Sequence, residues 1–249
     1  MKIALLLPTR ERLNNKFAFL MSALARCKDP KNYNLYMGID HDDPSLDRMK
    51  KVSEVVNNLK VVEIPPNPEN KFRLGYLWNY LAKNSTEEII SMLGDDMIFA
   101  SDNWDEKILE EFSEKNCPDK FKLVCGFDGH RKDKFASWLF IHRFYMEKTG
   151  YFMRKEFSRN WIDQWLDNMY ESFGRKVYKE DITIKHNHWV FGCSEMDKVA
   201  KRLQEFEGNK EFSDHLWPKL SEERIKEAKM WENVLGIKCN FDKIKWLLS

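Results

Sequence analysis

Two adjacent aspartates follow an apolar segment near the middle of the chain. The segment 89–93 leads through Gly94 to Asp95 and Asp96. Bare charge is costly beside buried strand positions, and two neighbouring carboxylates repel each other unless a cation joins them. Mg2+ and Mn2+ prefer oxygen ligands and often share them with substrate phosphates. The pair is therefore a candidate metal site, and the alternative is a turn whose carboxylates face solvent.

Polar residues also follow the first two apolar segments of the chain. Thr9 and Arg10 end the first segment, and Asp40 and Asp42 end the second. Ligands of open α/β sheets bind beyond the carboxyl ends of the strands. If these segments are neighbouring parallel strands, their polar ends lie at one edge of the sheet, together with Asp95.

The elements that would position these residues alternate through the first half of the chain. A continuous apolar run predicts a strand at 2–7, further strands are predicted at 34–39, 60–64 and 88–93, and helical spacing predicts helices at 17–24, 46–56 and 74–81. This order implies a doubly wound, mostly parallel α/β sheet with right-handed crossovers.

The second half combines different elements. The predicted elements are strands at 122–127 and 181–188 and helices at 141–148, 160–173 and 221–235. Asp163 falls in the first turn of one helix, off its apolar stripe, and His186 and His188 share one face of the late strand. We therefore predict one α/β domain over 1–190 and a helical extension over 191–249 that packs on it.

Composition excludes several classes of protein. The chain has 249 residues, 43% of them hydrophobic, which is ample for a folded core. A formal net charge of +1 provides no basic field for nucleic acid. The five cysteines are scattered, without metal-binding spacing, as in a reduced environment. The first apolar run is too short for a signal peptide, and no run is long enough to span a membrane. These features predict a cytoplasmic protein.

The order of the motifs resembles the GT-A fold nucleotide-sugar glycosyltransferases, especially the inverting family 2 type. Residues 8–10 are similar to the end of their first nucleotide-binding strand, and 40–43 falls where they hold the base or ribose. Arg73, followed six residues later by Asn79, resembles their helix before the metal motif. The segment 93–97 looks like their Asp-x-Asp region.

The resemblance continues downstream, and the chain departs from the family pattern at two positions. Gly94 occupies the first position of the Asp-x-Asp region, and Ile162 replaces the glutamate that usually precedes the catalytic aspartate. Asp163, followed by the helix end at Gly174, resembles the family's segment that carries the base. The strand that ends near His186 is similar to the one that carries their late histidine.

The resemblance implies a metal centre. Asp96 would bind Mn2+ or Mg2+ directly, and Asp95 would contact the donor ribose or sugar, or bind the metal through water. His186 would reach the ion from the other side, and His188 could exchange roles with it. The alternative for His186 is a strand histidine with no ligand role.

The resemblance also implies a donor site and a base. The predicted donor-binding residues are Thr9, Arg10, Asp40, Asp42, Lys71, Arg73 and Asp95. Asp40 and Asp42 compete for the nucleoside role, and the alternative for Arg10 is an ion pair with residues 40–43. Lys71 and Arg73 would meet the diphosphate, although Lys71 could equally lie on a solvated helix face. Asp163 would be the base that deprotonates the acceptor. The helix dipole lowers the basicity of a first-turn carboxylate, whereas burial raises it. The alternative for Asp163 is a capping role.

These assignments predict a metal-dependent glycosyltransferase. It would move a sugar from a nucleoside diphosphate sugar, with UDP favoured on family grounds, to a hydroxyl of a carbohydrate or other acceptor. Inversion with Asp163 as base is expected, and retention stays open. A sugar nucleotidylyltransferase is a weaker alternative, because its Gly-rich loop is missing after the first strand. Gly94 and Ile162 favour a third alternative, a non-catalytic nucleotide- or carbohydrate-binding module of the same fold.

Overall fold

The computed structural model describes residues 1–66, 74–157, 161–193, 198, 201 and 216–245. Its strands are β1 (Ile3–Thr9), β2 (Tyr33–Asp40), β3 (Leu59–Ile64), β4 (Ile89–Met92), β5 (Met97–Phe99), β6 (Leu123–Phe127), β7 (Leu139–His142) and β8 (Lys176–His186). Its α-helices are α1 (Leu13–Arg26), α2 (Leu46–Val55), α3 (Leu74–Lys83), α4 (Trp104–Glu111), α5 (Phe144–Thr149), α6 (Ile162–Ser172), α9 (Ser221–Leu235) and α10 (Phe241–Lys245), with 3-10 turns η1 (Pro30–Asn32) and η2 (Trp189–Phe191).

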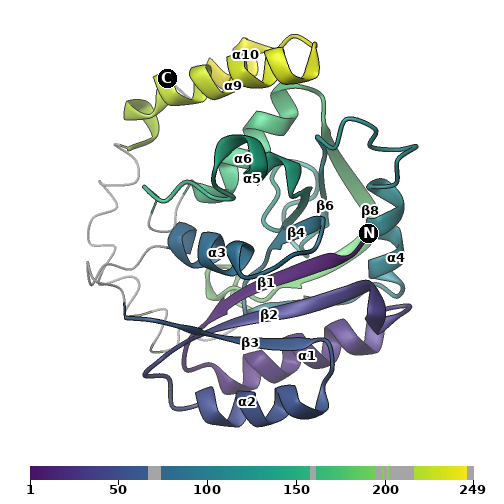
Figure 1. The fold of residues 1–249 in the computed structure, drawn as a ribbon, viewed down its shortest axis with the longest axis vertical. Coiled ribbons are helices and arrows are strands. Elements are labelled where there is room, and N and C mark those ends of the chain that lie inside the picture. The colour runs from purple at the N-terminus through teal and green to yellow at the C-terminus, as the bar shows by residue number, and fades with distance from the viewer. Residues whose placement is uncertain (67–73, 158–160, 194–197, 199–200, 202–215, 246–249) are drawn as a thin grey trace.

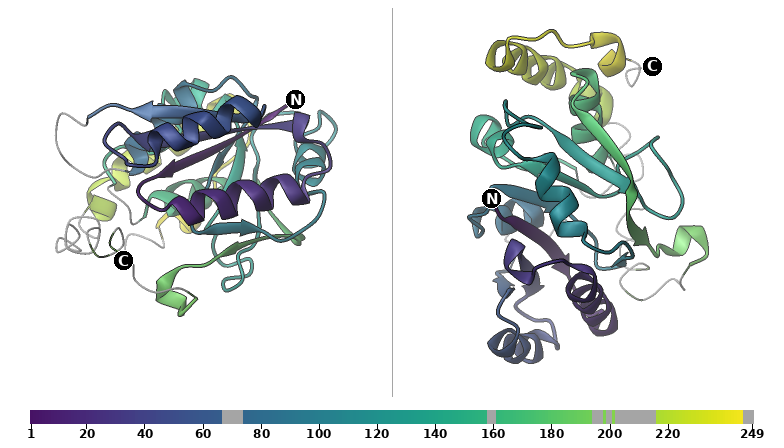
Figure 2. Two further views of the ribbon diagram at one scale, coloured as in Figure 1. Left: turned by 90° about the horizontal axis from the view of Figure 1, so that it is seen from below. Right: turned by 90° about the vertical axis from the view of Figure 1, so that its right-hand side faces the viewer.

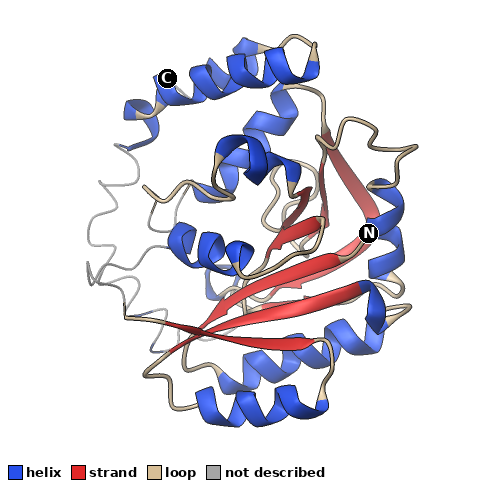
Figure 3. Cartoon of the chain, viewed as in Figure 1, coloured by secondary structure: helices blue, strands red, loops and turns tan. Residues whose placement is uncertain are grey.

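The eight strands form one sheet in the order β3-β2-β1-β4-β7-β6-β8-β5. β1 pairs in parallel with β2 and β4, and β2 pairs in parallel with β3, as the apolar runs predict. Every residue of β1 is buried, because α1 and α2 lie on one side of these strands and α3 lies on the other (Figures 1 and 3). The predicted doubly wound α/β fold is confirmed, as a mixed sheet.

The helix predicted at 141–148 is wrong in its first part. Residues 139–142 form β7, which pairs antiparallel with both β4 and β6, and the helix begins only at Phe144. A short continuous apolar run fits a buried strand as well as a buried helix. Here Ile90 and Ile141 lie opposite each other on β4 and β7, and this pairing across the sheet makes the segment a strand.

The topology brings the ends of distant strands together. Thr9 and Ile39 are partners at the ends of β1 and β2, and the turn with Asp95 and Asp96 follows β4. Directly after this turn, β5 pairs antiparallel with β8, so that Met97 lies opposite His186. The sheet therefore positions Thr9, the two aspartates and His186 at one edge.

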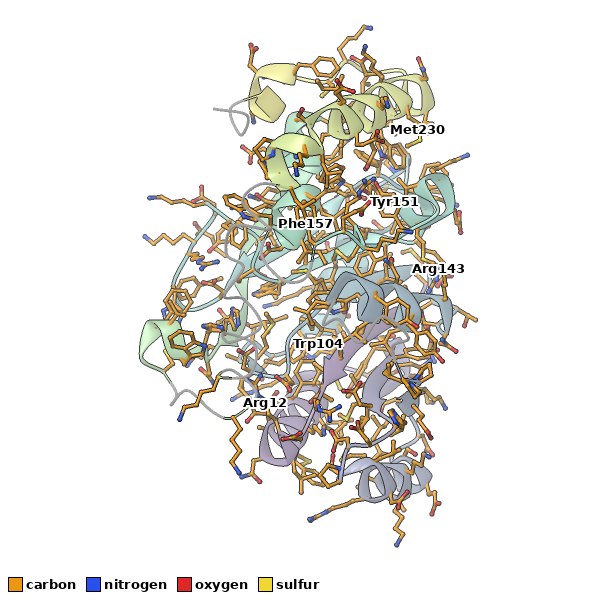
Figure 4. The ribbon with its side chains drawn as sticks, turned by 90° about the vertical axis from the view of Figure 1, so that its left-hand side faces the viewer. Arg12, Trp104, Arg143, Tyr151, Phe157 and Met230 are labelled. Atoms are coloured by element: carbon orange, nitrogen blue, oxygen red, sulfur yellow. The ribbon has the colours of Figure 1, made fainter. Side chains whose placement is uncertain are left out.

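The C-terminal helices lie at the opposite end of the molecule from α2 (Figures 1 and 2). Glu227 of α9 is 8% exposed, and its carboxylate accepts hydrogen bonds from the hydroxyls of Tyr145 and Tyr151 and, at 3.1 Å, from Trp165 Nε1. Tyr151 lies close to α9 (Figure 4). One buried carboxylate thus links α9 to α5 and α6. Within the described residues, no helix is both long enough and apolar enough to cross a membrane.

We expect Glu227→Leu to lower the free energy of unfolding by about 3 kcal/mol, because it leaves two buried donors, of Tyr145 and Trp165, and the partly buried Tyr151 hydroxyl without an acceptor. Urea denaturation measures the change. Glu223→Gln on the same helix is the matched control, since Glu223 pairs with Lys226 on the exposed surface and such pairs contribute about 0–1 kcal/mol. Equal effects of the two substitutions would contradict the assigned role of Glu227.

Candidate active site

Asp95 joins the end of β1 to the turn after β4. Its Oδ2 accepts a hydrogen bond of 2.6 Å from Thr9 Oγ1, and its Oδ1 lies 2.8 Å from Nη1 of Arg12. Burial raises the pKa of Asp95, against the opposing effects of Arg12 and Thr9. Arg12 precedes α1 (Figure 4). Both oxygens of Asp95 are therefore engaged by protein donors.

Asp96 faces the late histidine instead. His186 Nε2 lies 3.3 Å from Asp96 Oδ1, and both side chains are 18% exposed. The backbone N–H of Asn187 donates to the carbonyl oxygen of Asp96 at 2.9 Å. Burial acts to raise the pKa of Asp96, but the His186 hydrogen bond and the charges of His186, His188 and Arg12 outweigh it, so the pKa is lowered.

Gly94 has a steric role beside this pair. A Cβ atom at Gly94 would lie 2.8 Å from Asp96 Oδ1, closer than Cβ atoms approach an oxygen in proteins. A larger residue would push the Asp96 carboxylate from its position against His186. The departure from the Asp-x-Asp pattern is thus compatible with a working Asp96.

Asp96 and His186 are a partial fit to a divalent cation. Among the described residues, no group of three His, Cys, Asp or Glu side chains forms a cation site. Mg2+ and similar ions are often bound by one or two protein carboxylates together with substrate phosphates and water. The nitrogen of His186 that faces the Asp96 carboxylate is Nε2. The other ring nitrogen, Nδ1, is buried without a hydrogen-bond partner. These two side chains fit an ion whose other ligands come from the donor.

The predicted donor residues at the ends of β1 and β2 pair with one another. Arg10 Nη1 lies 2.6 Å from Asp40 Oδ2 and 2.7 Å from Asp42 Oδ1, and Arg10 Nη2 lies 2.8 Å from Asp42 Oδ2. The Arg10 hydrogen bond lowers the pKa of Asp42. The structure thus brings three predicted residues together as an ion-paired cluster. Lys71 and Arg73 lie outside the described residues.

A buried ion pair beneath this cluster is absent from the sequence-based prediction. Lys16 Nζ lies 2.8 Å from Asp43 Oδ2, and both side chains are fully buried. Asp43 also accepts from the backbone of Glu11 and from Ser45, through both its N–H and its hydroxyl. Burial opposes these bonds, yet they lower the pKa of Asp43 to about 2. This pair holds the loop that carries Asp40 and Asp42.

Asp163 lies in the first turn of α6, as predicted. Trp161, which precedes the helix, has a left-handed backbone with φ of 71°, and such strained residues cluster at functional sites. Burial raises the pKa of Asp163 to about 6, although the backbone N–H of Gln164 and the charge of Arg131 act against the rise. A carboxylate with this pKa is ionised at neutral pH and more basic than an ordinary aspartate.

The loop between β6 and β7 connects the neighbourhoods of Asp163 and His186. The backbone oxygen of Asp128 accepts from His186 N at 2.8 Å, and Arg131 of the same loop lies within electrostatic reach of Asp163. The sequence analysis assigns no function to this loop. The signal that could have identified it is the run of polar residues directly after a buried strand.

His188 lies beyond the end of β8 and directly precedes η2, so it does not share the strand face predicted for it, although its ring centroid is 5.2 Å from that of His186. Trp138 and Trp165 are core residues, so neither offers a surface on which a sugar could stack. Asn79 fixes the backbone of Phe152 and Met153.

Comparison with known proteins relates this arrangement to solved structures. No family model matches the sequence, and no curated protein sequence matches it. The structure resembles the mannosyltransferase PcManGT from Pyrobaculum calidifontis, solved with GDP-Man and Mn2+, at 9% identity and a TM-score of 0.60 over 75% of this chain and 57% of that one. It also resembles TarS 1–349 from S. aureus, at 15% identity and a TM-score of 0.57, over 74% of this chain and 59% of that one.

A further neighbour is TarS 1–349 in complex with UDP-GlcNAc, at 14% identity and a TM-score of 0.56, over 74% of this chain and 57% of that one. The chain spans somewhat more than half the length of these structures. At such low identity the likeness concerns the fold alone. The chain has the GT-A fold that its motif order predicts.

Proposed function

We propose that the protein is a metal-dependent glycosyltransferase. It moves a sugar from a nucleoside diphosphate sugar to a hydroxyl group of a carbohydrate or other acceptor, with inversion. UDP is the proposed nucleotide, on the motif resemblance and the neighbour solved with UDP-GlcNAc. GDP is the competing choice, since another neighbour was solved with GDP-Man.

The observation that carries the proposal is the separation of the two aspartates into different environments. Asp95 is engaged by Thr9 and Arg12, whereas Asp96 faces His186 at the partly exposed edge of the sheet. In this proposal Asp95 contacts the nucleoside, and Asp96 and His186 hold Mn2+ or Mg2+. When bound, the ion would stabilise negative charge that develops on the departing diphosphate.

Asp163 acts on the acceptor in this proposal. One of its oxygens takes the proton of the acceptor hydroxyl while the hydroxyl oxygen forms a bond to the anomeric carbon of the sugar. The bond from that carbon to the diphosphate breaks, and its electron pair leaves with the nucleoside diphosphate. A carboxylate with a pKa of about 6 suits proton acceptance near neutral pH.

The donor nucleoside would contact the cluster at the ends of β1 and β2. Thr9 and Asp95 offer oxygens to the base and ribose. Asp40 and Asp42 would accept hydrogen bonds from the nucleoside when Arg10 turns toward a phosphate or the base. Lys71 and Arg73 stay proposed partners of the diphosphate.

A panel of nucleotide sugars tests the function. With Mn2+ present, we expect one donor to release its free nucleoside diphosphate, slowly to water and faster once a suitable acceptor is added. EDTA should abolish the release. Binding of a nucleotide without release from any donor would instead support the non-catalytic module, and the absence of both would refute the proposal.

A further inference from the structure

The loop that follows β6 has a shape fixed by one buried carboxylate. Asp128 is 2% exposed, and its carboxylate accepts from the backbone N–H groups of His130 and Arg131, at 2.8 and 2.6 Å, and from the Ser137 hydroxyl at 2.7 Å. Lys132 has a positive φ of 25°, a conformation that costs about 1–3 kcal/mol in a non-glycine residue. The loop is held in one strained conformation beside His186.

This conformation presents the guanidinium of Arg131 between two aromatic rings. The guanidinium carbon lies 5.0 Å from the ring centroid of Phe135 and 5.2 Å from that of Phe191, and His130 stacks on Phe191 at 4.1 Å. Arg131 is exposed, and its side chain makes no hydrogen bond or ion pair with any described residue. The rings restrict the side chain while its N–H groups stay available.

The surroundings of Arg131 favour binding of an anion on the side of the site where Asp163 would meet the acceptor. Phe135, which packs against Arg131, lines a pocket together with Gln164, the residue that follows Asp163, and the charge of Arg131 acts on Asp163. The carboxylates proposed for the nucleoside and the metal, Asp95 and Asp96, already face Arg12 and His186. Residues 130–134 are all exposed and include three Lys or Arg and one Asp. The loop therefore places excess positive charge within electrostatic reach of the proposed base, on the side where an acceptor must arrive.

We propose that Arg131 binds a phosphate or carboxylate group on the acceptor, so that the acceptor is an anionic hydroxyl compound. The guanidinium offers a planar pair of N–H donors that matches either oxyanion. This inference rests on the proposed function, since an acceptor exists only if the protein transfers a group.

Calorimetric titration of the full chain tests the inference with three small hydroxyl probes: glycerol 3-phosphate, glycerate and neutral glycerol. We expect one or both anions to bind and glycerol not to bind, and the stronger anion identifies the group. Arg131→Ala should weaken anion binding about tenfold, in the range of a charge-assisted hydrogen bond. Arg131→Lys should give an intermediate value. Arg48→Ala is the matched control, because Arg48 is also exposed and lies 5.4 Å from a ring centroid, that of Phe17 on α1.

Repeating the titration with UDP or GDP and Mn2+ separates acceptor from donor. Anion binding that persists beside the nucleotide, with nucleotide affinity unchanged in Arg131→Ala, supports the acceptor site. Competition between the anion and the nucleotide assigns Arg131 to the donor diphosphate and overturns the inference. Equal anion binding by wild type and Arg131→Ala, or none by wild type, also overturns it. Failure of the donor panel would refute the proposed function without removing Arg131-dependent anion binding.

Discussion

Asp163→Asn is expected to slow sugar transfer by about 10²–10⁴-fold, the usual contribution of a general base. The amide keeps the size of the side chain and can still accept from Gln164 N, which donates to Asp163 at 3.0 Å, but it cannot take a proton from the acceptor. We therefore expect the loss in kcat, with donor affinity preserved. Steady-state kinetics on the donor selected by the panel measures both. A near-normal rate would refute the role of Asp163 as base and favour a retaining route.

The pH dependence of the wild-type enzyme follows from the same carboxyl group. Because the pKa of Asp163 is raised to about 6, the base is ionised above that pH and protonated below it. The transfer rate should fall as the pH decreases through about 6. A rate that declines only near pH 4 would indicate a base with an ordinary carboxyl pKa.

Asp163→Asn should also stabilise the protein at high pH. The folded state raises the pKa of Asp163 from 3.8 to about 6, so it binds the proton more tightly than the unfolded chain does. Stability from this proton is fully present below about pH 4 and is lost as the pH rises through about 6. The loss amounts to about 3 kcal/mol at most. Because Asn carries no charge at any pH, the variant avoids this loss of stability.

Thermal unfolding at two pH values checks this effect. At pH 8 the variant should melt several degrees above wild type, and at pH 4 the two should melt together. Asp102→Asn is the control, since Asp102 is exposed and pairs with Arg26 on the surface. A gain of the same size at both pH values, or a less stable variant at pH 8, would show that the ionised Asp163 carboxylate does not destabilise the fold.

The parallel half of the fold and the edge of the candidate site could be predicted because both follow from local patterns. Continuous apolar runs mark strands covered on both faces, and β1 and β4, which are buried throughout, are of this kind. Once the alternation with helices implies a parallel sheet, the strand ends must share an edge. Thr9 and Asp95, 86 residues apart in sequence, are hydrogen-bonded there.

The parts that could not be predicted depend on partners distant in sequence. A lysine in a helix is expected on the solvated face, yet Lys16 is fully buried against Asp43. No local sequence pattern reveals a pairing of that kind. Arg12 is similar, because its contact with Asp95 spans 83 residues. β7 is a strand only because β4 and β6 pair with it on both sides. Local propensity fixes none of these contacts.

Asp96→Asn is expected to abolish the response of the protein to Mn2+. The amide oxygen can still accept from His186, so the fold should persist, but a neutral amide is a much weaker ligand for a hard divalent ion than a carboxylate. In wild type, Mn2+ should tighten the binding of the nucleoside diphosphate and raise the melting temperature of the complex. In the variant both effects should disappear, and donor turnover should fall by at least about 10²-fold.

Asp95→Asn separates the roles of the two neighbours. Because both oxygens of Asp95 are engaged by Thr9 and Arg12, this substitution should weaken nucleotide binding with and without metal while the Mn2+ response remains. Calorimetry with UDP and GDP, with and without Mn2+, measures both quantities for each variant. If Asp95→Asn removes the metal response and Asp96→Asn retains it, the metal role belongs to Asp95. If neither variant alters the response, the ion is held elsewhere and the proposed centre at Asp96 and His186 is wrong.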